Sequence, residues 1–387
     1  MTELKPAQRA AVTAADGAVL GVAGAGSGKT RVLVHRAAWL IDVEGVSPQA
    51  LLAVTFTNKA AAEMRSRIES LLNIPVRHLW IGTFHGLAHR MLRRHWREAG
   101  WPQNFQIIDS DDQLRMIKRL LKNLEIDDSR WVPREVQYFI NGQKDEGLRA
   151  EHIEPHGDLF LATMQKIYLA YDDQCSRSGL VEFNELLLRA LELIRDNDDL
   201  RGHYQRRFRH ILVDEFQDTN AIQYAWLRLL AGGGAGITIV GDDDQSIYGW
   251  RGAKIENIHK LGADFADLRT IRLEQNYRST GTILAAANAV ITHNTDRLGK
   301  ELWTEFGQGD PVRLYAAFNE VDEARFVASK VQSAQQTGMN RSEMAVLYRS
   351  NAQSRVLEEA FLQSGIAYRI YGGQRFFERV EIKNALA

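Results

Sequence analysis

The feature that most constrains this chain is a glycine-rich turn between an apolar run and a helical pattern. Residues 22–31 read Val-Ala-Gly-Ala-Gly-Ser-Gly-Lys-Thr-Arg. Closely spaced glycines let backbone N–H groups surround an anion, and a helix N-terminus adds its positive dipole end. Lys29 can then reach the β- and γ-phosphates of a nucleotide, and the Thr30 hydroxyl can bind Mg²⁺. The segment predicts a phosphate-binding loop.

The predicted loop consists of Ala23, Gly24, Ala25, Gly26, Ser27, Gly28, Lys29 and Thr30. Ala23 stands where the usual G-x-x-x-x-G-K-[ST] pattern has its first glycine, so the strict form fails by one residue. The alternative is a Gly/Ala-rich turn that ends in Lys-Thr by accident.

Composition places few limits on the function. The chain has 387 residues, of which 45% are hydrophobic and 25% charged, as in globular proteins with room for two or three domains. A net charge of −1 excludes a wholly basic, histone-like binder but not nucleic acid bound through local patches. One cysteine, Cys175, rules out a disulfide within the chain. No signal-peptide layout and no membrane-spanning run is seen, so we expect a cytoplasmic protein.

Two helical stretches carry cationic stripes at i, i+3, i+4 and i+7 spacing. They are Arg90, Arg93, Arg94 and Arg97, and then Arg115, Lys118, Arg119 and Lys122. Either stripe could bind nucleic acid or form a solvated helix face. For the first stripe both interpretations stay open, and for the second the solvated face is favoured.

Apolar, β-rich runs alternate with helical patterns in the first 274 residues. They lie at 51–56, 78–82, 210–213, 237–240 and 270–273. This alternation predicts an α/β fold with a mostly parallel sheet covered by helices. Residues 85–208 show helical periodicity instead, which predicts a helical subdomain inserted between parts 1–84 and 209–274 of one domain.

A second α/β pattern begins after residue 274. Helices are expected at 280–294, 320–336 and 351–363, and strands at 312–316, 343–348 and 366–371. The final residues read as a helix with no stop signal, so 275–387 is expected to be an incomplete second domain and 387 a truncation point.

Two acids follow an apolar strand at residues 211–218, Ile-Leu-Val-Asp-Glu-Phe-Gln-Asp. Ligands of open α/β sheets lie at the carboxyl ends of strands. Asp214 can hold Mg²⁺, and Glu215 can orient and deprotonate a water that attacks a γ-phosphate. The alternative is an acidic surface turn.

Residues 240–252 form another polar turn after a strand. There, Gln245 can sense a γ-phosphate, while Tyr248, Trp250 and Arg251 suit base stacking and phosphate contact on single-stranded nucleic acid. The alternative, core aromatics, fits poorly in a Gly/Asp-rich turn. Further along, Arg278 could enter the nucleotide site as an arginine finger.

Five strings in a fixed order carry a family resemblance. They are residues 54–64, 82–86, 214–220, 241–253 and 275–279. Together they resemble the superfamily 1 DNA helicases of the UvrD/Rep/PcrA type. The resemblance covers essentially the whole chain and implies RecA-like motor domains of the P-loop NTPase class.

The resemblance also implies roles for single residues. Gln8 would read adenine, although Lys5 stands where the family usually has Asn, and Tyr277 would stack on the adenine. Arg31 would lie beside the nucleotide, and Arg278 would be an arginine finger. DNA contacts would come from Phe56, Asn58, His85, Phe183, Tyr248, Trp250, Arg251, Arg349 and Asn351.

These observations predict an ATP- and Mg²⁺-dependent DNA helicase that moves on single-stranded DNA and unwinds duplex at junctions, and the family resemblance implies movement 3′ to 5′. A role in DNA repair with repair-protein partners follows from the resemblance alone. Two motifs that complete the family's second motor domain are missing here, so an ATP-switched DNA-binding module without unwinding stays an alternative. A metabolite kinase or GTPase is a second rival, but residues 58–61 fail the Asn-Lys-x-Asp guanine signature at the last position.

Overall fold

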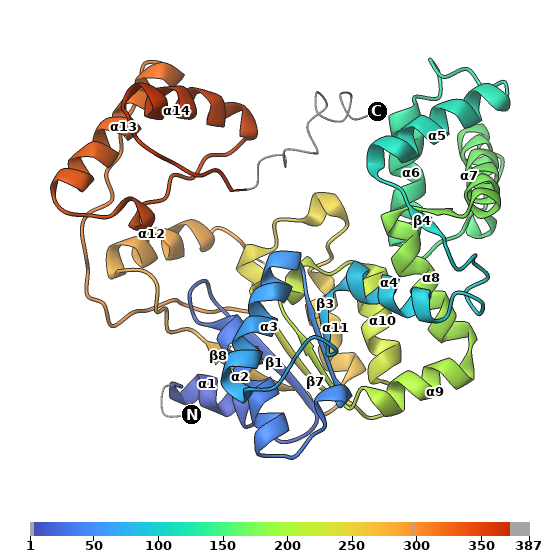
Figure 1. Cartoon of the computed structure of the whole chain (residues 1–387), viewed down its shortest axis with the longest axis horizontal. Coiled ribbons are helices and arrows are strands. Elements are labelled where there is room, and N and C mark those ends of the chain that lie inside the picture. The colour runs from blue at the N-terminus through green and yellow to red at the C-terminus, as the bar shows by residue number, and fades with distance from the viewer. Residues whose placement is uncertain (1–3, 296, 372–387) are drawn as a thin grey trace. The chain divides into compact units, whose positions relative to one another are not determined.

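The first compact unit, which ends at Asp310, is built on a six-stranded parallel sheet (Figure 1). The computed structural model describes residues 4–295 and 297–371. The strand order is β3-β2-β6-β7-β1-β8. The strands are β1 (Ala18–Ala23), β2 (Leu51–Thr55), β3 (Trp80–Thr83), β6 (His210–Val213), β7 (Gly236–Gly241) and β8 (Arg269–Leu273). Each apolar run predicted as a strand falls on one of them, and the α/β fold class is confirmed.

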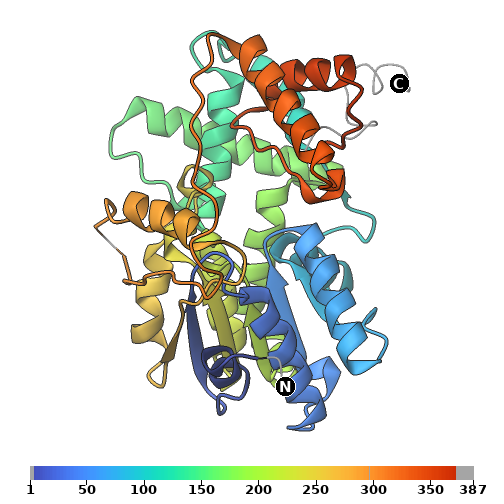
Figure 2. The same ribbon diagram turned by 90° about the vertical axis from the view of Figure 1, so that its left-hand side faces the viewer.

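Alternation along the strands divides the apolar side chains between two cores. Leu52 and Val54 join one core, while Leu51 and Ala53 join the other. Because successive strand residues point to opposite faces, the buried strands need cover on both sides. Figure 2 shows helices on both sides of the sheet. One core includes α1 (Pro6–Val12), α2 (Lys29–Asp42) and α3 (Asn58–Leu72), and the other includes α4 (Phe84–Arg94), α8 (Phe183–Asp196), α10 (Ala221–Ala231) and α11 (Glu256–Asp264).

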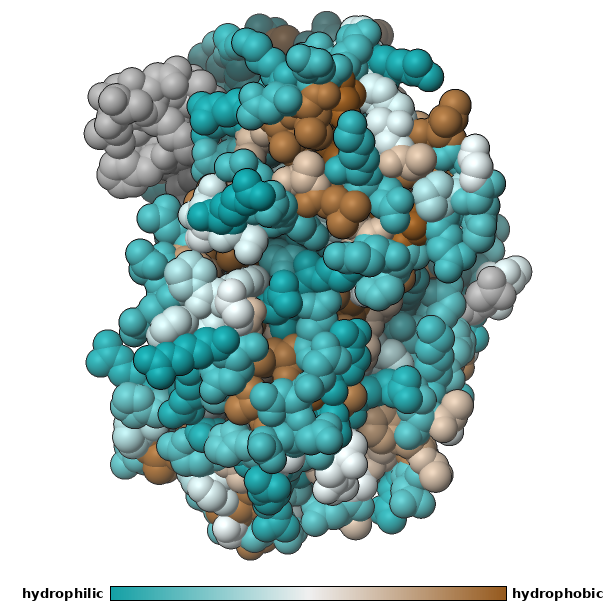
Figure 3. Space-filling model, turned by 90° about the vertical axis from the view of Figure 1, so that its right-hand side faces the viewer, coloured by the Kyte–Doolittle hydropathy of each residue, from teal (hydrophilic) through white to brown (hydrophobic). Residues whose placement is uncertain are grey.

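The chain between β3 and β6 is mainly helical, as its periodicity predicts. Besides α4 and α8 it contains α5 (Ser110–Asn123), α6 (Pro133–Asp145), α7 (Leu159–Ser178) and α9 (Asp198–Arg207). A short parallel pair, β4 (Gln106–Ile107) with β5 (Leu180–Val181), was not predicted. The face that lies on the right in Figure 1 is mostly hydrophilic, with separate hydrophobic patches (Figure 3).

Three residues of the first cationic stripe lie on α4, while Arg97 lies in the turn after the helix ends at Arg94, so the stripe does not continue along one helix face. At least half of it is structural. Arg90 donates to the backbone oxygens of Leu79 (2.8 Å) and His78 (3.0 Å). Arg93 donates to those of Gln103 and Phe105, both at 2.8 Å. These two guanidinium groups satisfy carbonyls that the fold would otherwise leave unpaired.

Residues 275–310 belong to the first compact unit and contain α12 (Gly281–Ile291). The division of the chain into parts at 84/85, 208/209 and 274/275 stays a prediction. Short 3₁₀ turns complete the element list: η1 (Pro48–Ala50), η2 (Ala150–His152), η3 (Phe216–Asp218), η4 (Asp243–Gln245), η5 (Gly249–Arg251) and η6 (Arg341–Glu343).

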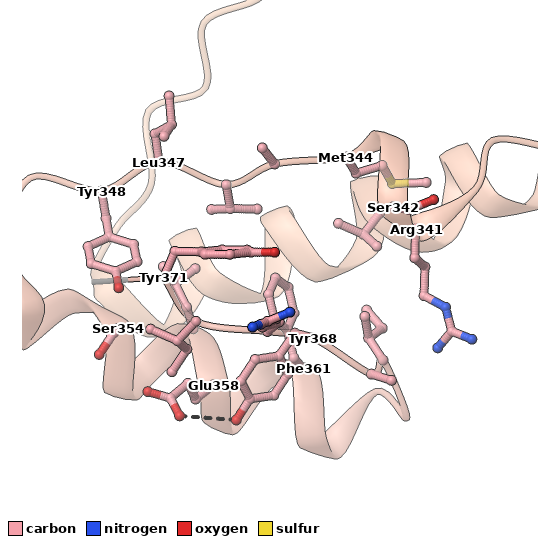
Figure 4. Close-up of a pocket in the computed structure, with 18 of the residues that line it drawn as sticks. Arg341, Ser342, Met344, Leu347, Tyr348, Ser354, Glu358, Phe361, Tyr368 and Tyr371 are labelled. Carbon is pink, nitrogen blue, oxygen red and sulfur yellow. Dashed lines mark hydrogen bonds between the residues drawn. The ribbon is translucent and has the colours of Figure 1, made fainter. Parts of the chain in front are cut away.

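The second unit, from Pro311, pairs α13 (Glu320–Gln336) with α14 (Asn351–Gln363), and both helices match the predicted ranges. The strands expected at 312–316, 343–348 and 366–371 are wrong for the described residues, where these segments pair with no strand and Glu343 ends η6. An extended segment becomes a strand only when a neighbour pairs with its backbone. Residues 344–348 and 366–371, with α14, line a cavity of about 800 Å³ (Figure 4).

Among the residues that the model describes, every helix is too short or too polar to cross a membrane.

Candidate functional site

The glycine-rich turn leads from β1 directly into α2, as the sequence predicts. Gly26 and Gly28 adopt left-handed backbone conformations, with φ of 68° and 87°. A Cβ on Gly26 would lie 2.6 Å from the Asn276 Nδ2 atom, and one on Gly28 would lie 2.8 Å from Gln8 Nε2. Both the conformation and the space therefore require glycine. Ala23 ends β1 and is fully buried.

Gln8 packs against this turn from α1. Its side chain is buried, and its amide donates to the Ser27 backbone oxygen at 2.8 Å. The Gln8 Oε1 atom accepts from the Lys5 N–H at 3.3 Å. Lys5 thus keeps a backbone contact to Gln8 that needs no particular side chain.

Four side chains meet where β1 and β6 end. The Thr30 hydroxyl donates to Asp214 Oδ2 at 3.0 Å. Lys29 Nζ lies 2.8 Å from Glu215 Oε2, an ion pair without hydrogen-bond alignment, and has no hydrogen-bond partner among the described residues. Glu215 has a left-handed φ of 49°, a strained conformation of the kind that clusters at functional sites.

Two carboxyl groups at this edge are costly to ionise. Burial, with the neighbouring Glu215 charge, raises the pKa of Asp214 to about 6. The same two causes raise the pKa of Asp218 to about 7, and its Oδ1 atom has no hydrogen-bond partner in the described chain. A bound cation would relieve the first of these costs directly.

A chain of amide groups links β6 to the end of β7. The Gln217 amide donates to Glu215 Oε2 at 2.8 Å, and Gln217 Oε1 accepts from the Asp242 N–H at 2.9 Å. Asp242 Oδ2 in turn accepts from the Gln245 amide at 2.5 Å. Gln245 therefore sits on the same network as the acids that follow β6.

The segment after β8 closes against the glycine-rich turn. The buried Asn276 amide donates to the Ala25 backbone oxygen at 2.6 Å, and the Tyr277 N–H donates to the Gly26 oxygen at 2.9 Å. Asn276 Oδ1 accepts from the Arg278 N–H at 2.8 Å. Arg278 is exposed, and its Cβ would lie 2.9 Å from a Cβ on Gly26.

Tyr277 is half-buried beside the turn. Burial and the Glu305 charge raise its pKa, and Arg31 partly offsets the rise, so Arg31 lies within electrostatic reach of the phenol. The Tyr277 hydroxyl donates to Gln275 Oε1 at 2.8 Å.

Three aromatic rings form a row, here called the aromatic row, after β2 and β7. Phe56 stacks on Tyr248 with ring centroids 5.3 Å apart and planes 26° apart. The centroid of Trp250 lies 6.4 Å from that of Tyr248, and Trp250 is 75% exposed. These rings are not core residues, which removes the structural alternative weighed for Tyr248 and Trp250.

His85 and Phe183 meet at the N-termini of α4 and α8, with ring centroids 5.9 Å apart and nearly perpendicular planes. Burial lowers the pKa of His85 to about 4, so the imidazole is neutral at neutral pH. Phe183 is 50% exposed. Asn58 is exposed at the first position of α3, where Thr57 accepts from the Ala60 N–H at 3.1 Å.

Three further DNA contacts stay predictions. Arg349 and Asn351 lie at the start of α14 in the second unit, which is described by itself. The side chain of Arg251 lies outside the described residues.

Sequence reasoning missed Asn276, Gln217 and Asp218 as parts of the site. Each lies in a string that the sequence analysis quoted, but their residue types alone do not separate a site residue from a turn former. For Asn276 and Gln217, the available signal was a side-chain amide within a few residues of a predicted ligand.

The comparisons with known proteins agree with this geometry. The UvrD/REP helicase N-terminal domain matches residues 4–266, and the UvrD-like helicase C-terminal domain matches 271–387. DNA helicase II of Escherichia coli K12 is 59% identical over 387 residues, 100% of this chain and 54% of that protein. ATP-dependent DNA helicase PcrA of Staphylococcus aureus NCTC 8325 is 44% identical over 388 residues, 100% of this chain and 53% of that protein.

The chain therefore spans about half the length of the curated relatives it matches. Because the two family models together account for nearly all of its residues, the chain belongs to the UvrD/Rep helicase family.

Proposed function

We propose that the protein containing this chain is an ATP-dependent DNA helicase that moves along single-stranded DNA. The observation that carries the proposal is the carboxyl edge of one sheet. There, Thr30 and Lys29 after β1 contact the acids after β6, and the aromatic row follows β2 and β7 of the same sheet. A structural change in the loops after β1 and β6 could therefore reach the loops that carry the aromatic row through the strands that they share.

The residues present fit a magnesium–triphosphate group. Lys29 Nζ is buried without a hydrogen-bond partner in the described chain, as expected of a donor that awaits an anion. Thr30 and Asp214 would hold Mg²⁺, since a hydroxyl and a carboxylate are its usual ligands and the raised pKa of Asp214 signals uncompensated charge. Mg²⁺ would neutralise charge on the β- and γ-phosphates.

The remaining roles belong to this chain's own side chains. Glu215 would accept the proton of the attacking water, after the phosphates give Lys29 a partner other than Glu215. Gln245 would sense the γ-phosphate, and Arg278 would stabilise charge on the transferred group. Gln8 and Tyr277 would hold adenine, with Arg31 beside the nucleotide.

On the DNA side, Phe56, Tyr248 and Trp250 would stack bases, and His85, Phe183 and Asn58 would line the same strand. A row of rings with an exposed Trp250 suits sequence-independent binding because every base has a π-face. Arg251, Arg349 and Asn351 would add backbone contacts. We further propose 3′-to-5′ movement, junction binding, a repair role with protein partners, and a cytoplasmic location.

Two measurements on the natural full-length protein test the proposal. They are ATP hydrolysis with and without single-stranded DNA, and strand displacement from a 3′-tailed duplex. We expect DNA to stimulate hydrolysis and ATP to drive displacement. Stimulation without displacement would instead support an ATP-switched DNA-binding module. A rate of hydrolysis that does not change when DNA is added would support a small-molecule kinase or GTPase and contradict the proposal.

A further inference from the structure

Residues 297–303, here called the strap, contact both the loop after β7 and the glycine-rich turn. Lys300 Nζ lies 2.8 Å from Asp242 Oδ1 and 2.9 Å from Asp244 Oδ2, and it also contacts Asp243. Arg297 binds Asp244 through two nitrogens, at 2.6 and 2.8 Å. The three consecutive carboxylates are thereby held by two cations from one short segment.

The ammonium group is placed inside the protein. The side chains of Lys300 and Asp242 are 1% and 2% exposed. The three carboxylates alone would resemble a cation site, but Lys300 Nζ already lies within contact distance of all of them. Burial lowers the pKa of Lys300, and the three aspartates outweigh it, so the pKa is raised and the ammonium stays charged.

Asp242 uses its two oxygens for different partners. Oδ1 contacts Lys300, and Oδ2 accepts from the amide of Gln245 at 2.5 Å. The Asp244 N–H also donates to Oδ1, at 3.2 Å, so the ammonium and this N–H together restrict the orientation of the carboxylate that meets Gln245. Without Lys300, only Asp244 would keep a contacting cation in the described chain, Arg297, and the charges of Asp242 and Asp243 would repel each other and the incoming phosphates.

The other end of the strap contacts the glycine-rich turn. The Leu302 side chain lies over Gly24, where a Cβ would come 1.9 Å from Leu302 Cδ2. The Trp303 backbone oxygen accepts from the Asn276 N–H at 2.8 Å, and Asn276 itself holds Ala25. One segment thus contacts the phosphate-binding turn and, through Lys300 and Asp242, the residue proposed to sense the γ-phosphate.

We propose that Lys300 is a positioning residue that orients Gln245 through Asp242 and so couples the nucleotide site to the loop that carries Tyr248 and Trp250. The inference rests on the proposed function, because it concerns how DNA binding and ATP hydrolysis communicate. It adds a residue, and a segment, to which the motif analysis gave no role.

The test compares Lys300→Met with Lys300→Arg in the natural full-length protein. Met keeps the length of the side chain without its charge, and Arg keeps the charge. We expect Lys300→Met to lower the DNA-stimulated kcat about tenfold or more while the KM for ATP changes less, and Lys300→Arg to recover part of the loss. Lys260→Met, an exposed lysine on α11, controls for the loss of one positive charge.

A double-mutant cycle separates positioning from general stabilisation. If Lys300 acts through Gln245, then Lys300→Met should add little to the loss already caused by Gln245→Ala. Additive losses, or full stimulation in Lys300→Met, would overturn the inference. If Lys300→Met fails to fold, the charge-balanced double variant Lys300→Met/Asp243→Asn takes its place in the cycle. A wild-type protein without DNA stimulation would contradict the proposed function instead.

Discussion

Two groups of residues share one edge of one sheet but are built in opposite ways: the aromatic row, and the proposed nucleotide site around Lys29, Thr30, Asp214 and Glu215, here called the pocket. In the pocket, Lys29 and Asp214 are buried and each contacts another side chain, in the Lys29–Glu215 and Thr30–Asp214 pairs. In the row, Trp250 is 75% exposed, Phe56 stacks on Tyr248, and the rings of Tyr248 and Trp250 are tilted by 48°.

This difference follows from what each surface has to recognise. Charge stabilisation in phosphoryl transfer requires fixed dipoles in a site that excludes water, because mobile groups would lose energy to reorganisation. A surface that grips and releases successive bases needs open π-faces and tolerance of sequence. We therefore expect ATP hydrolysis to respond to the loss of single atoms in the pocket, and DNA affinity to respond to the loss of a whole ring in the row.

The largest effect that could break this comparison comes from Lys29→Ala. Removal of the buried ammonium should lower DNA-stimulated ATP hydrolysis by about 10²–10³-fold or more, because a fixed charge proposed to meet the β- and γ-phosphates is lost. Steady-state hydrolysis with saturating single-stranded DNA measures this. Activity within a few-fold of wild type would contradict the assignment of the pocket.

Trp250→Ala tests the row in the same way. Loss of one stacked base costs about 1–3 kcal/mol, or about 5- to 150-fold in affinity for single-stranded DNA. Fluorescence anisotropy with a labelled oligonucleotide measures the change, and Tyr138→Ala provides a control for loss of an exposed ring on α6. Equal affinities for the Trp250 variant and the control would show that the row is not the DNA surface.

Asn276→Asp sharpens the expectation that the pocket responds to single atoms. The carboxylate still accepts from the Arg278 and Ser279 N–H groups but can no longer donate to the Ala25 oxygen. Loss of this buried hydrogen bond should raise the KM for ATP about five- to tenfold. Asn276→Ala, which loses all three bonds, should be worse, and equal values for the two variants would refute the role of the Ala25 contact.

The smallest expected effect concerns pH and the cost of the buried carboxyl of Asp218. Its pKa is raised from 3.8 to about 7, so the folded state binds its proton more tightly, and this contribution to stability is lost as pH rises from about 4 to about 7. Asp218→Asn should raise the Tm by about 2–4 °C at pH 8 and by less near pH 4. If the Tm difference between Asp218→Asn and wild type does not depend on pH, ionisation of Asp218 does not destabilise the folded state.

Prediction from sequence succeeded where a local pattern has one structural meaning. The buried strand runs, the glycine-rich turn and the helices of the second unit all fall where periodicity and turn residues put them. It failed for the strands expected at 312–316, 343–348 and 366–371, because a strand depends on a neighbour that local sequence does not supply.

By itself, the sequence determined the α/β class and the residue types that can meet a phosphate and a base, because these depend on spacing along one strand, turn or helix. Only the tertiary structure decided that Lys300 meets three aspartates from more than fifty residues away and that Asn276 holds the turn at Ala25. The physical reason is that burial and side-chain direction are set by packing between segments distant in the chain.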